Sequence, residues 1–426
     1  MGATRVGQTG AMGIGAVVVF AVLLIGVASA LVRVNGPPLA NLNFMVGMVA
    51  GELAGQLLAV TIGLVAVLVV VGWPSGALGA ADLGLALAAA GGFGALLTGG
   101  LRSRGVVTRS LGAARWPQPD DSGTGRPAWL RWWRTWLAIP RGGASVRVDR
   151  DIAYVDDGGV DDAHLLDVIR PVGDVTNAPV MLFVHGGAWV IGSKREQGLP
   201  MLFELASRGW VCVTCNYRLS PKATWPDHVV DVKRALAWTR AHAHEYGGNP
   251  SRFLAISGGS AGGQLASLAA LTPSDAAFQP GFEDADTSVD ACVSLYGALE
   301  MTGDRTLMGR QGLALQKLLS TRVMKVAVDD APALYAAASP IERIIAAAPA
   351  FLVIQGTKDS LVPVEVARAF VAKFERTSGA PLGYVELPLA QHAFDLLCSP
   401  RSSATTRGIA DALEALVRSR ASAPSP

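Results

Sequence analysis

Residues 252–265 read RFLAISGGSAGGQL: an apolar run, a glycine-rich turn and the start of a second apolar stretch. The turn places Gly258, Ser260 and Gly262 in the pattern G-x-S-x-G. Because the chain contains 49 glycines, this pattern alone is weak support for a nucleophilic serine. It gains weight because the run before it predicts a strand and the stretch after it predicts a helix, the setting in which such a serine stands exposed on a sharp turn.

Short apolar runs alternate with helical stretches on both sides of this turn. Eight runs predict strands, the first two with the character of edge strands: SVRVDRDIAYV, HLLDVIR, PVMLFVH, GWVCVTCNY, RFLAIS, ACVSLYG, AFLVIQG and GYVELP. Between the later runs lie helical stretches such as DHVVDVKRALAWTRAHAHEYG and PVEVARAFVAKFER. This alternation predicts an α/β domain over residues 145–426, with a mostly parallel sheet that carries helices on both faces.

Long uncharged stretches fill the first hundred residues. No Asp, Glu, Lys or Arg occurs in residues 6–32, 53–81 and 83–101. A bilayer core about 30 Å thick requires roughly 20 apolar residues in a helix. We therefore expect an all-α transmembrane region over residues 1–100 with two or three helices, at about 12–32, 53–73 and 83–98, the third being the weakest. Alternatively, the first span is a secretory signal peptide, because Ala28-Ser29-Ala30 has the form of a cleavage site.

Flanking arginines predict the orientation. With three uncleaved spans, Arg5 lies on one side of the membrane, and five arginines lie on the other: Arg33, Arg102, Arg104, Arg109 and Arg115. The positive-inside rule then places the C-terminal domain in the cytoplasm. Cleavage after Ala30 would instead leave two spans and an external domain.

Residues 101–144 are predicted to form a linker and a tryptophan-rich interfacial helix. The segment WPQPDDSGTGRP is followed by AWLRWWRTWLAIP, in which four tryptophans recur at spacings of three and four. On a helix these indoles would share one face, which suits the lipid headgroup region. The same helix could instead pack on the α/β domain, and the two interpretations are compatible.

Charge and cysteine content exclude several classes of function. A net charge of +2 without a basic cluster argues against a nucleic-acid partner. Cys212 and Cys215 form a C-x-x-C pair, but it lies in a strand-like run and no second Cys or His pair completes a zinc site. We interpret the cysteines as buried free thiols.

A nucleophilic serine needs a base within about 3 Å and a carboxylate to orient that base. Of the six histidines we select His392, which follows the last predicted strand at the carboxyl edge of the sheet. For the carboxylate we select Asp359, which lies just past another strand end and before Pro363. Asp395 is the alternative acid, although its place three residues after His392 suits a structural hydrogen bond better.

The segment HGGAW, residues 185–189, is predicted to supply an oxyanion hole. The N–H groups of Gly186 and Gly187 can turn into the cleft, and the N–H of Ala261 follows the serine. We assign Trp189 and Tyr296 to substrate binding. His185 is expected to anchor the loop rather than to take part in catalysis.

The order Ser260, Asp359, His392, with HGGAW about 75 residues before the serine, resembles the α/β-hydrolase superfamily. More narrowly it resembles the hormone-sensitive-lipase-like carboxylesterases, to which NYRLSPKATWPDHVVDVKRALAW is also similar. The resemblance covers about residues 145–420. It implies an α/β-hydrolase fold in which the serine is the nucleophile, the histidine the base and the aspartate the orienting acid, with Gly186, Gly187 and Ala261 as oxyanion donors.

Two regions qualify this resemblance. The family's usual third glycine is Ala188 here, and the GG-x-W variant is similar to arylformamidase-like and small-ester hydrolases. Residues 298–345 look like the family's small cap. Their methionines and leucines would suit acyl chains, although ordinary packing explains them equally well.

From these features we expect a membrane-anchored serine carboxylesterase or lipase that works through an acyl-enzyme on Ser260, with no metal or cofactor. Its partners would be a small-molecule or lipid ester and membrane lipids. The alternatives are an arylformamidase- or amidase-like hydrolase of the same fold and an inactive membrane scaffold. The sequence does not specify the acyl length, the alcohol group or the oligomeric state.

Overall fold

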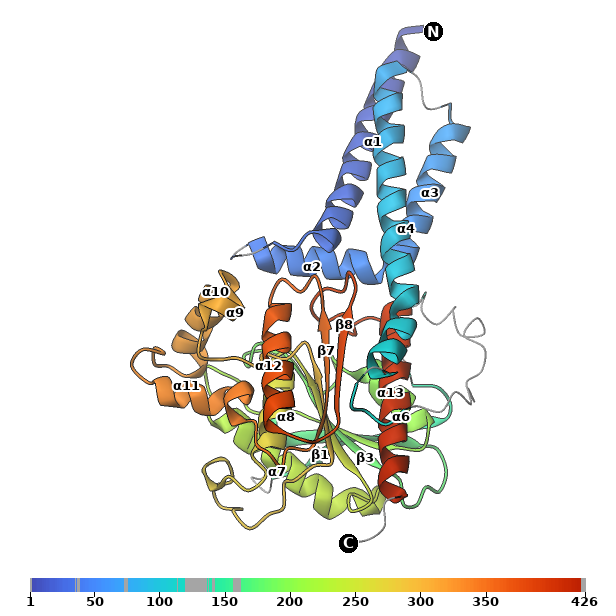
Figure 1. Cartoon of the computed structure of the whole chain (residues 1–426). Coiled ribbons are helices and arrows are strands. Elements are labelled where there is room, and N and C mark those ends of the chain that lie inside the picture. Colours follow the sequence, from blue (N-terminus) through green and yellow to red (C-terminus); the bar gives the residue numbers. More distant parts are fainter. Residues whose placement is uncertain are drawn as a thin grey trace.

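The computed structural model of the chain describes residues 2–34, 36, 39–72, 76–112, 114–118, 136, 138–139, 142–155 and 162–422. Helices near the N-terminus stand on an α/β domain, with the chain's C-terminus at the far end of that domain (Figure 1). Most of the predicted tryptophan-rich helix, including residues 119–135, lies outside the described residues.

A single sheet of eight strands forms the centre of the domain, in the order β1-β2-β4-β3-β5-β6-β7-β8. The strands are β1 (Val146–Ala153), β2 (Leu165–Pro171), β3 (Val180–Val184), β4 (Val211–Cys215), β5 (Leu254–Gly259), β6 (Ala291–Leu295), β7 (Ala350–Gly356) and β8 (Leu382–Leu387). Strand β2 pairs in antiparallel fashion with both β1 and β4, and all other neighbouring strands, from β4 and β3 to β8, are parallel. The predicted α/β class with a mostly parallel sheet is therefore confirmed.

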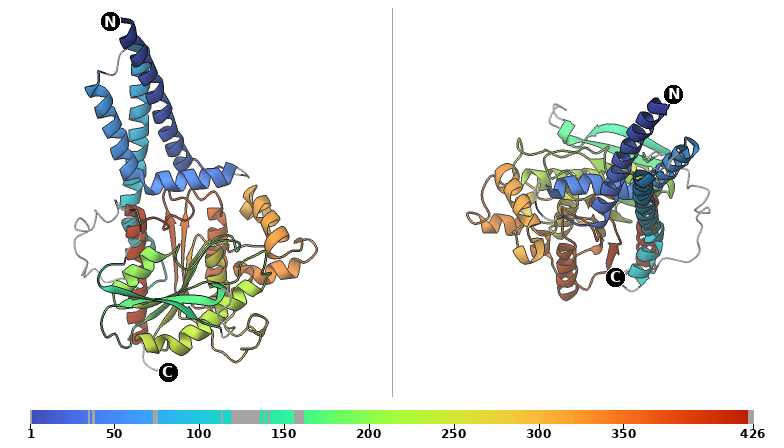
Figure 2. Two further views of the ribbon diagram at one scale, coloured as in Figure 1. Left: turned by 180° about the vertical axis from the view of Figure 1, so that it is seen from behind. Right: turned by 90° about the horizontal axis from the view of Figure 1, so that it is seen from above.

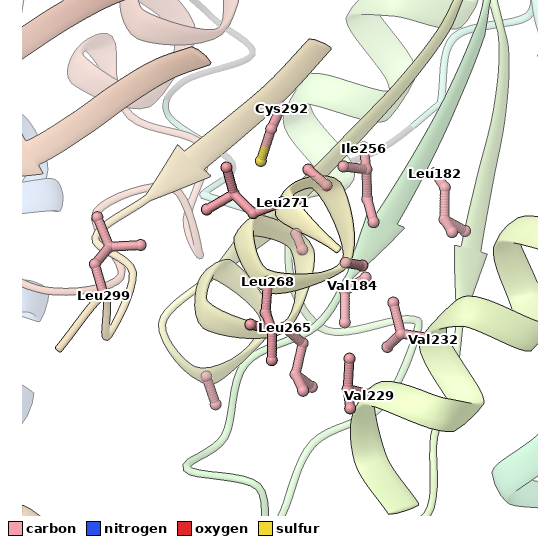
Figure 3. Close-up of a cluster of buried hydrophobic side chains, with 14 of the residues drawn as sticks. Leu182, Val184, Val229, Val232, Ile256, Leu265, Leu268, Leu271, Cys292 and Leu299 are labelled. Carbon is pink, nitrogen blue, oxygen red and sulfur yellow. The ribbon is translucent and has the colours of Figure 1, made fainter. Parts of the chain in front are cut away.

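Helices cover both faces of the sheet. One face carries α7 (Asp227–His242), α8 (Ala261–Leu271) and α12 (Val364–Thr377), and the other carries α6 (Leu199–Ser207) and α13 (Pro400–Ala421). Figure 3 shows the first face, where Leu182, Val184 and Ile256 from the strands meet leucines of α8 and valines of α7. Because both faces are covered, the central strands β3 to β7 are buried at every position instead of alternating between buried and exposed.

The predicted cap region lies between β6 and β7 and is mostly helical. It contains α9 (Arg305–Met308), α10 (Gln311–Leu318), the π-turn η5 (Leu319–Val323), α11 (Pro332–Ala338) and the 3₁₀ turn η6 (Pro340–Arg343). Met301, Met308, Leu319 and Met324 are buried and belong to the main core cluster. For these four side chains, ordinary packing is the interpretation that the structure favours. The remaining short 3₁₀ turns are η2 (Asp162–His164), η3 (Ala243–Tyr246) and η4 (Ala276–Phe278).

Among the described residues, four helices precede the domain: α1 (Gly2–Leu31), α2 (Leu39–Glu52), α3 (Ala54–Val70) and α4 (Gly76–Gly112). Helices α1, α3 and α4 rise away from the domain, whereas α2 lies crosswise at their base (Figures 1 and 2). By length and composition, one helix of the described residues, Gly79–Gly112, could cross a membrane, and α2 with α3 would pass only as one span bent by 76°. The apolar part of α1, Gly15–Leu31, is shorter.

Helix α4 continues past residue 100, where the helical region was predicted to end. Its last turns carry Val107 and Leu111, which are buried in the same core cluster as α6 and α13. The helix continues because this second apolar stretch is covered by the α/β domain. Two ion pairs also tie the helices to the domain: Arg33 Nη1 lies 3.1 Å from Glu365 Oε2, and Arg401 Nε lies 3.0 Å from Glu52 Oε1.

Candidate active site

Ser260 lies on the sharp turn between β5 and α8, with φ 57° and ψ −121°. A non-glycine residue adopts a positive φ only at a cost that the surrounding structure must offset. The turn also brings backbones too close for side chains. A Cβ on Gly258 would lie 2.3 Å from the Gly262 oxygen, and one on Gly262 would lie 2.1 Å from the Val184 oxygen. Both glycines of the G-x-S-x-G pattern are therefore required sterically.

The structure brings together the three side chains selected as a catalytic triad. His392 Nε2 lies 2.8 Å from Ser260 Oγ, and His392 Nδ1 lies 2.7 Å from Asp359 Oδ2. The side chains follow β5, β7 and β8, whose carboxyl ends meet at one edge of the sheet. This geometry allows the imidazole to accept the serine proton while the carboxylate holds the other ring nitrogen.

Hydrogen bonds hold the Asp359 carboxylate in a fixed orientation. Its Oδ1 accepts from the N–H groups of Leu361 and Val362, at 2.9 and 2.8 Å. Its Oδ2 accepts from Gln355 Nε2 at 2.8 Å. These three donors fix the carboxylate so that Oδ2 faces His392 Nδ1. Gln355 was not found from the sequence, although it is the single polar side chain in the buried strand β7, AFLVIQG, and this was a signal that could have drawn attention to it.

Gln391 connects the loops that carry the acid and the base. Its Oε1 accepts from the N–H groups of Ser360 at 2.8 Å and His392 at 3.0 Å. Its Nε2 donates to Asn43 Oδ1 of α2 at 3.4 Å. The residue was missed at the sequence level, although its position directly before His392 was a signal that could have drawn attention to it.

The predicted oxyanion donors do not all have free N–H groups. The N–H of Gly186 donates to Gln197 Oε1 at 2.7 Å, so the structure does not support Gly186 as a donor. Gly187 and Ala188 both have positive φ, at 117° and 54°. Within the described part of the chain, the N–H groups of Gly187, Ala188 and Ala261 have no hydrogen-bond acceptor. The physical reason for the correction is that the side chain of Gln197 reaches the first glycine, which the sequence pattern could not reveal.

Trp189 and Tyr296 both lie inside the protein rather than on an open surface. Trp189 is 2% exposed, and its Nε1 donates to Gln264 Oε1 at 3.0 Å. Tyr296 is fully buried, its ring centroid lies 4.7 Å from that of His392, and its hydroxyl donates to Asp395 Oδ1. Their geometry suits a role in supporting the loop and the imidazole more than direct contact with substrate.

Asp395, the alternative acid, faces Tyr296 and not the imidazole nitrogens. Burial raises the pKa of the Asp395 carboxyl above its ordinary value, while the hydrogen bond from Tyr296 acts in the opposite direction. Burial also raises the pKa of Tyr296 well above its usual range. The pair therefore forms a structural hydrogen bond beside the triad, as the spacing of Asp395 and His392 suggested.

His185 anchors the loop that carries the glycines. Its Nδ1 donates to the Gly186 carbonyl at 2.7 Å in the tautomer that this contact requires, and its ring stacks on Tyr217 at 4.4 Å. Burial lowers the pKa of His185 to about 4, so the ring is neutral near pH 7. It lies in the loop as an anchor, the position expected for it.

Helix α2 lies directly against His392. The rings of Phe44 and His392 meet edge to face at 5.6 Å, and Ser360 Oγ donates to the Ala40 carbonyl at 3.4 Å. The sequence did not predict this contact, because it joins segments almost 350 residues apart. Among the described residues, no group of three or more His, Cys, Asp or Glu side chains is arranged to hold a metal ion.

Comparisons with known proteins agree with this geometry. The family described as BD-FAE matches residues 166–374. The chain is 46% identical over 304 residues to "Probable carboxylic ester hydrolase LipM" of Mycobacterium tuberculosis, covering 71% of this chain and 67% of that protein. It is 44% identical over 320 residues to "Esterase LipC" of the same organism, covering 75% and 74%. Among solved structures, the esterase Est2 of Thermogutta terrifontis has a TM-score of 0.51 and 26% identity, covering 65% of this chain and 92% of that one.

Proposed function

This chain belongs to the α/β-hydrolase esterase family of LipM and LipC and carries a BD-FAE domain, and we propose that it is a membrane-anchored esterase that forms an acyl-enzyme on Ser260. Its homologues support the hydrolysis of carboxylic esters. The observation that carries the serine mechanism is the chain of contacts from Ser260 Oγ to His392 at 2.8 Å and from His392 to Asp359 at 2.7 Å.

In the first half of the reaction, His392 Nε2 accepts the proton of Ser260 Oγ as that oxygen attacks the ester carbonyl carbon. The carbonyl oxygen becomes an oxyanion, and the imidazolium is balanced by Asp359. When the tetrahedral intermediate collapses, the bond to the alcohol breaks and His392 protonates the leaving oxygen. The acyl group then remains on Ser260 as an ester.

Water completes the cycle. His392 Nε2, now neutral, accepts a proton from a water molecule whose oxygen attacks the acyl carbon. Collapse of the second tetrahedral intermediate returns the proton to Ser260 Oγ and releases the carboxylic acid. The same nitrogen thus acts first as a base and then as an acid in each half of the reaction.

We assign the oxyanion hole to the N–H groups of Gly187, Ala188 and Ala261. These three are unpaired among the described residues, whereas Gly186 is held by Gln197. Each such donor is worth about 3 to 4 kcal/mol of transition-state stabilisation in comparable sites. In our assignment Ala188 takes the place of Gly186. The backbone of Ala188 already has a positive φ, so this position needs no glycine for its N–H to act as a donor.

The finer classification is also part of the proposal. The motif order and the helical segment over residues 298–345 suit a hormone-sensitive-lipase-like enzyme with a small cap. Residues 1–100 would be the membrane region, 101–144 the connecting segment and 145–426 the catalytic domain, with the last turns of α4 packed on that domain. The membrane region would have two or three spans, and in an arrangement with three, formed by α1, α3 and α4, the flanking arginines would put the domain in the cytoplasm.

The mechanism is tested with the full-length protein and p-nitrophenyl esters from acetate to octanoate. Ser260→Ala should lower kcat/KM by at least about 10⁴-fold, because the nucleophile is lost while the fold is kept. The matched control is Ser251→Ala, an exposed serine in the turn that precedes β5, which should retain wild-type activity.

A fluorophosphonate probe provides a second readout. The probe should label the wild-type protein and the Ser251→Ala variant, but not Ser260→Ala. Equal hydrolysis by the Ser260→Ala variant would contradict the mechanism. Absence of both labelling and hydrolysis in folded wild-type protein would favour the inactive scaffold, and cleavage of aryl formamides in preference to esters would favour the arylformamidase alternative.

A further inference from the structure

Helix α2 has two faces of very different character. Four large apolar side chains of α2 are exposed, beside the polar Asn41: Leu39, Leu42, Met45 and Val49, with exposed fractions of 61%, 60%, 62% and 42%. At 3.6 residues per turn these four fall within about 120° of the helix circumference, and Phe44 lies on the other side. No charged residue occurs between Arg33 and Glu52. The outer face of α2, defined by these four residues, is therefore apolar and carries no charge.

The inner face of α2 is bonded to the loops that hold the acid and the base. Phe44 packs against the ring of His392 at 5.6 Å. The carbonyl of Ala40 accepts from Ser360, the neighbour of Asp359, and Asn43 accepts from Gln391, the neighbour of His392. Helix α2 thus covers His392, the proposed base of the triad, and its outer face is turned away from the domain.

The apolar outer face continues onto the helices that rise beside it. Each rising helix exposes large apolar side chains: Val18, Val22 and Ile25 of α1, Val60, Ile62 and Val67 of α3, and Leu83 and Leu87 of α4. In water, exposed surfaces of this kind are unfavourable by about 25 cal/mol per Å². Because α2 lies crosswise at the base of these helices, a membrane that covers them would meet α2 along its length (Figures 1 and 2).

The change from apolar to charged surface occurs at the level of α2. Helix α4 has no charged residue from 83 to 101, and Arg102 and Arg104 are then exposed. Trp136, 46% exposed, offers its carbonyl to Gln56 at the first turn of α3. Arginines and an indole at one height are typical of the lipid headgroup region. This places the membrane surface beside α2, independently of the apolar character of α2 itself.

From these observations we propose that the outer face of α2 lies in the lipid–water interface and that the esters cleaved at Ser260 are acyl lipids supplied from the bilayer. The inference rests on the proposed function of a membrane-anchored esterase and adds the source and class of its substrate. A long-chain ester partitions into the bilayer, so a site roofed by an interfacial helix meets it at a far higher local concentration than in water. The ester reaches the serine without crossing bulk solvent.

The test uses the full-length protein in vesicles of diether phosphatidylcholine, which contains no competing ester. Two substrates are compared: p-nitrophenyl acetate, which is supplied from water, and 4-methylumbelliferyl oleate, which resides in the bilayer. The variant is Leu42→Glu with Met45→Glu, which keeps good helix formers but places two charges on the outer face. The matched control is Val172→Glu with Thr176→Glu, two exposed residues between β2 and β3 at the opposite end of the domain.

We expect the rate of oleate ester hydrolysis to fall at least tenfold in the α2 variant and the rate of acetate hydrolysis to fall less than twofold. The control variant should retain both rates. In the wild-type protein the oleate rate should follow the mole fraction of ester in the bilayer and not its bulk concentration. An unchanged oleate rate in the variant, or a parallel loss of both activities, would overturn the inference. Failure of wild-type protein to hydrolyse either ester would instead refute the proposed function.

Discussion

The two ends of helix α4 are both apolar, yet different surroundings cover them. Near its start, Leu87 is 64% exposed and faces away from the domain together with the other rising helices. Near its end, Val107 and Leu111 are at most 1% exposed and pack among the side chains of α13 and the sheet. A Cβ on Gly408 of α13 would lie 2.4 Å from Val107 Cγ1, which shows how closely the two helices approach.

Apolar composition therefore predicts that a segment is removed from water, but it does not predict whether lipid or a protein core surrounds that segment. Lipid and a protein core select similar residues, and only the packing partners distinguish them. In the proposed function the chain divides in the same way: the domain holds the groups that react with the ester, and the helices provide access to them from the membrane. Changes on the two sides should therefore have different consequences.

The largest effect is expected in the domain, at Asp359. Asp359→Asn should lower kcat for p-nitrophenyl acetate by about 10³- to 10⁴-fold, because an amide no longer stabilises the imidazolium and favours the wrong tautomer of His392. The matched change is Asp395→Asn at the other buried aspartate, which bonds Tyr296 and whose pKa burial already raises. It should cost less than about tenfold in kcat. Comparable losses in the two variants would contradict our choice of acid.

The next largest effect distinguishes the two ends of α4 by how much each contributes to the free energy of unfolding. Leu111→Ala should reduce the free energy of unfolding of the domain by about 2 to 5 kcal/mol, because it leaves a cavity in a closed core. Leu87→Ala should change it by less than about 0.5 kcal/mol, since that side chain is exposed. Thermal unfolding in detergent, followed by circular dichroism, should show a Tm lowered by roughly 5 °C or more for Leu111→Ala alone. Equal shifts would mean that both ends of α4 have the same environment.

The stability of the domain should also depend on pH through two buried histidines. Burial lowers the pKa of His185 and of His228 to about 4, below the value of about 6.5 in an unfolded chain. Between these values the unfolded state binds more protons, so the free energy of unfolding falls as the pH falls. From pH 7 to 5 the loss should be roughly 2 kcal/mol per histidine.

The histidine contribution is measured as the difference in Tm between pH 7 and pH 5. In His228→Gln that difference should be smaller than in the wild-type protein, whatever the Tm of the variant at pH 7. His244→Gln, a change at an exposed histidine, is the control and should keep the wild-type difference. A pH dependence that is the same in all three proteins would show that other groups control it.

The smallest effect concerns the point at which the helical region touches the triad. Phe44→Leu removes the edge-to-face contact with His392 while keeping an apolar side chain. An aromatic pair of this kind is worth about 0.5 to 1.5 kcal/mol, so kcat should fall by about two- to tenfold. The control is Val46→Leu on the same helix. A loss as large as that for Asp359→Asn would show that α2 takes part in the chemistry and not only in positioning the base.

Much of the domain could be predicted because the signals are local. Strand runs separated by helical stretches define a mostly parallel sheet, and in such a sheet the residues that follow successive strands converge at one edge. For this reason Ser260, Asp359 and His392 could be selected together although they are far apart in the sequence. Cys212 and Cys215 of β4 could likewise be interpreted as buried thiols. They belong to the two core clusters on opposite faces of the sheet.

The direction in which N–H groups and side chains point, and the residues that contact them, could not be predicted in the same way. A turn of glycines indicates free N–H groups, but Gln197 occupies that of Gly186. An aromatic residue near the serine suggests a substrate contact, but Trp189 and Tyr296 face inward to Gln264 and Asp395. Each of these outcomes depends on a side chain from another element, whose approach no local pattern encodes.

The amino-acid sequence was enough to predict the α/β class of the fold and to select the serine turn and its partners, because short-range periodicity and strand order indicate which residues meet at one edge of the sheet. Only the tertiary structure shows that α2 crosses over His392, that α4 ends within the domain core and that, in the part of the chain it describes, the N–H groups of Gly187, Ala188 and Ala261 have no acceptor. These features arise from contacts between segments hundreds of residues apart. Their free energies depend on packing in three dimensions, which composition and spacing along the chain do not contain.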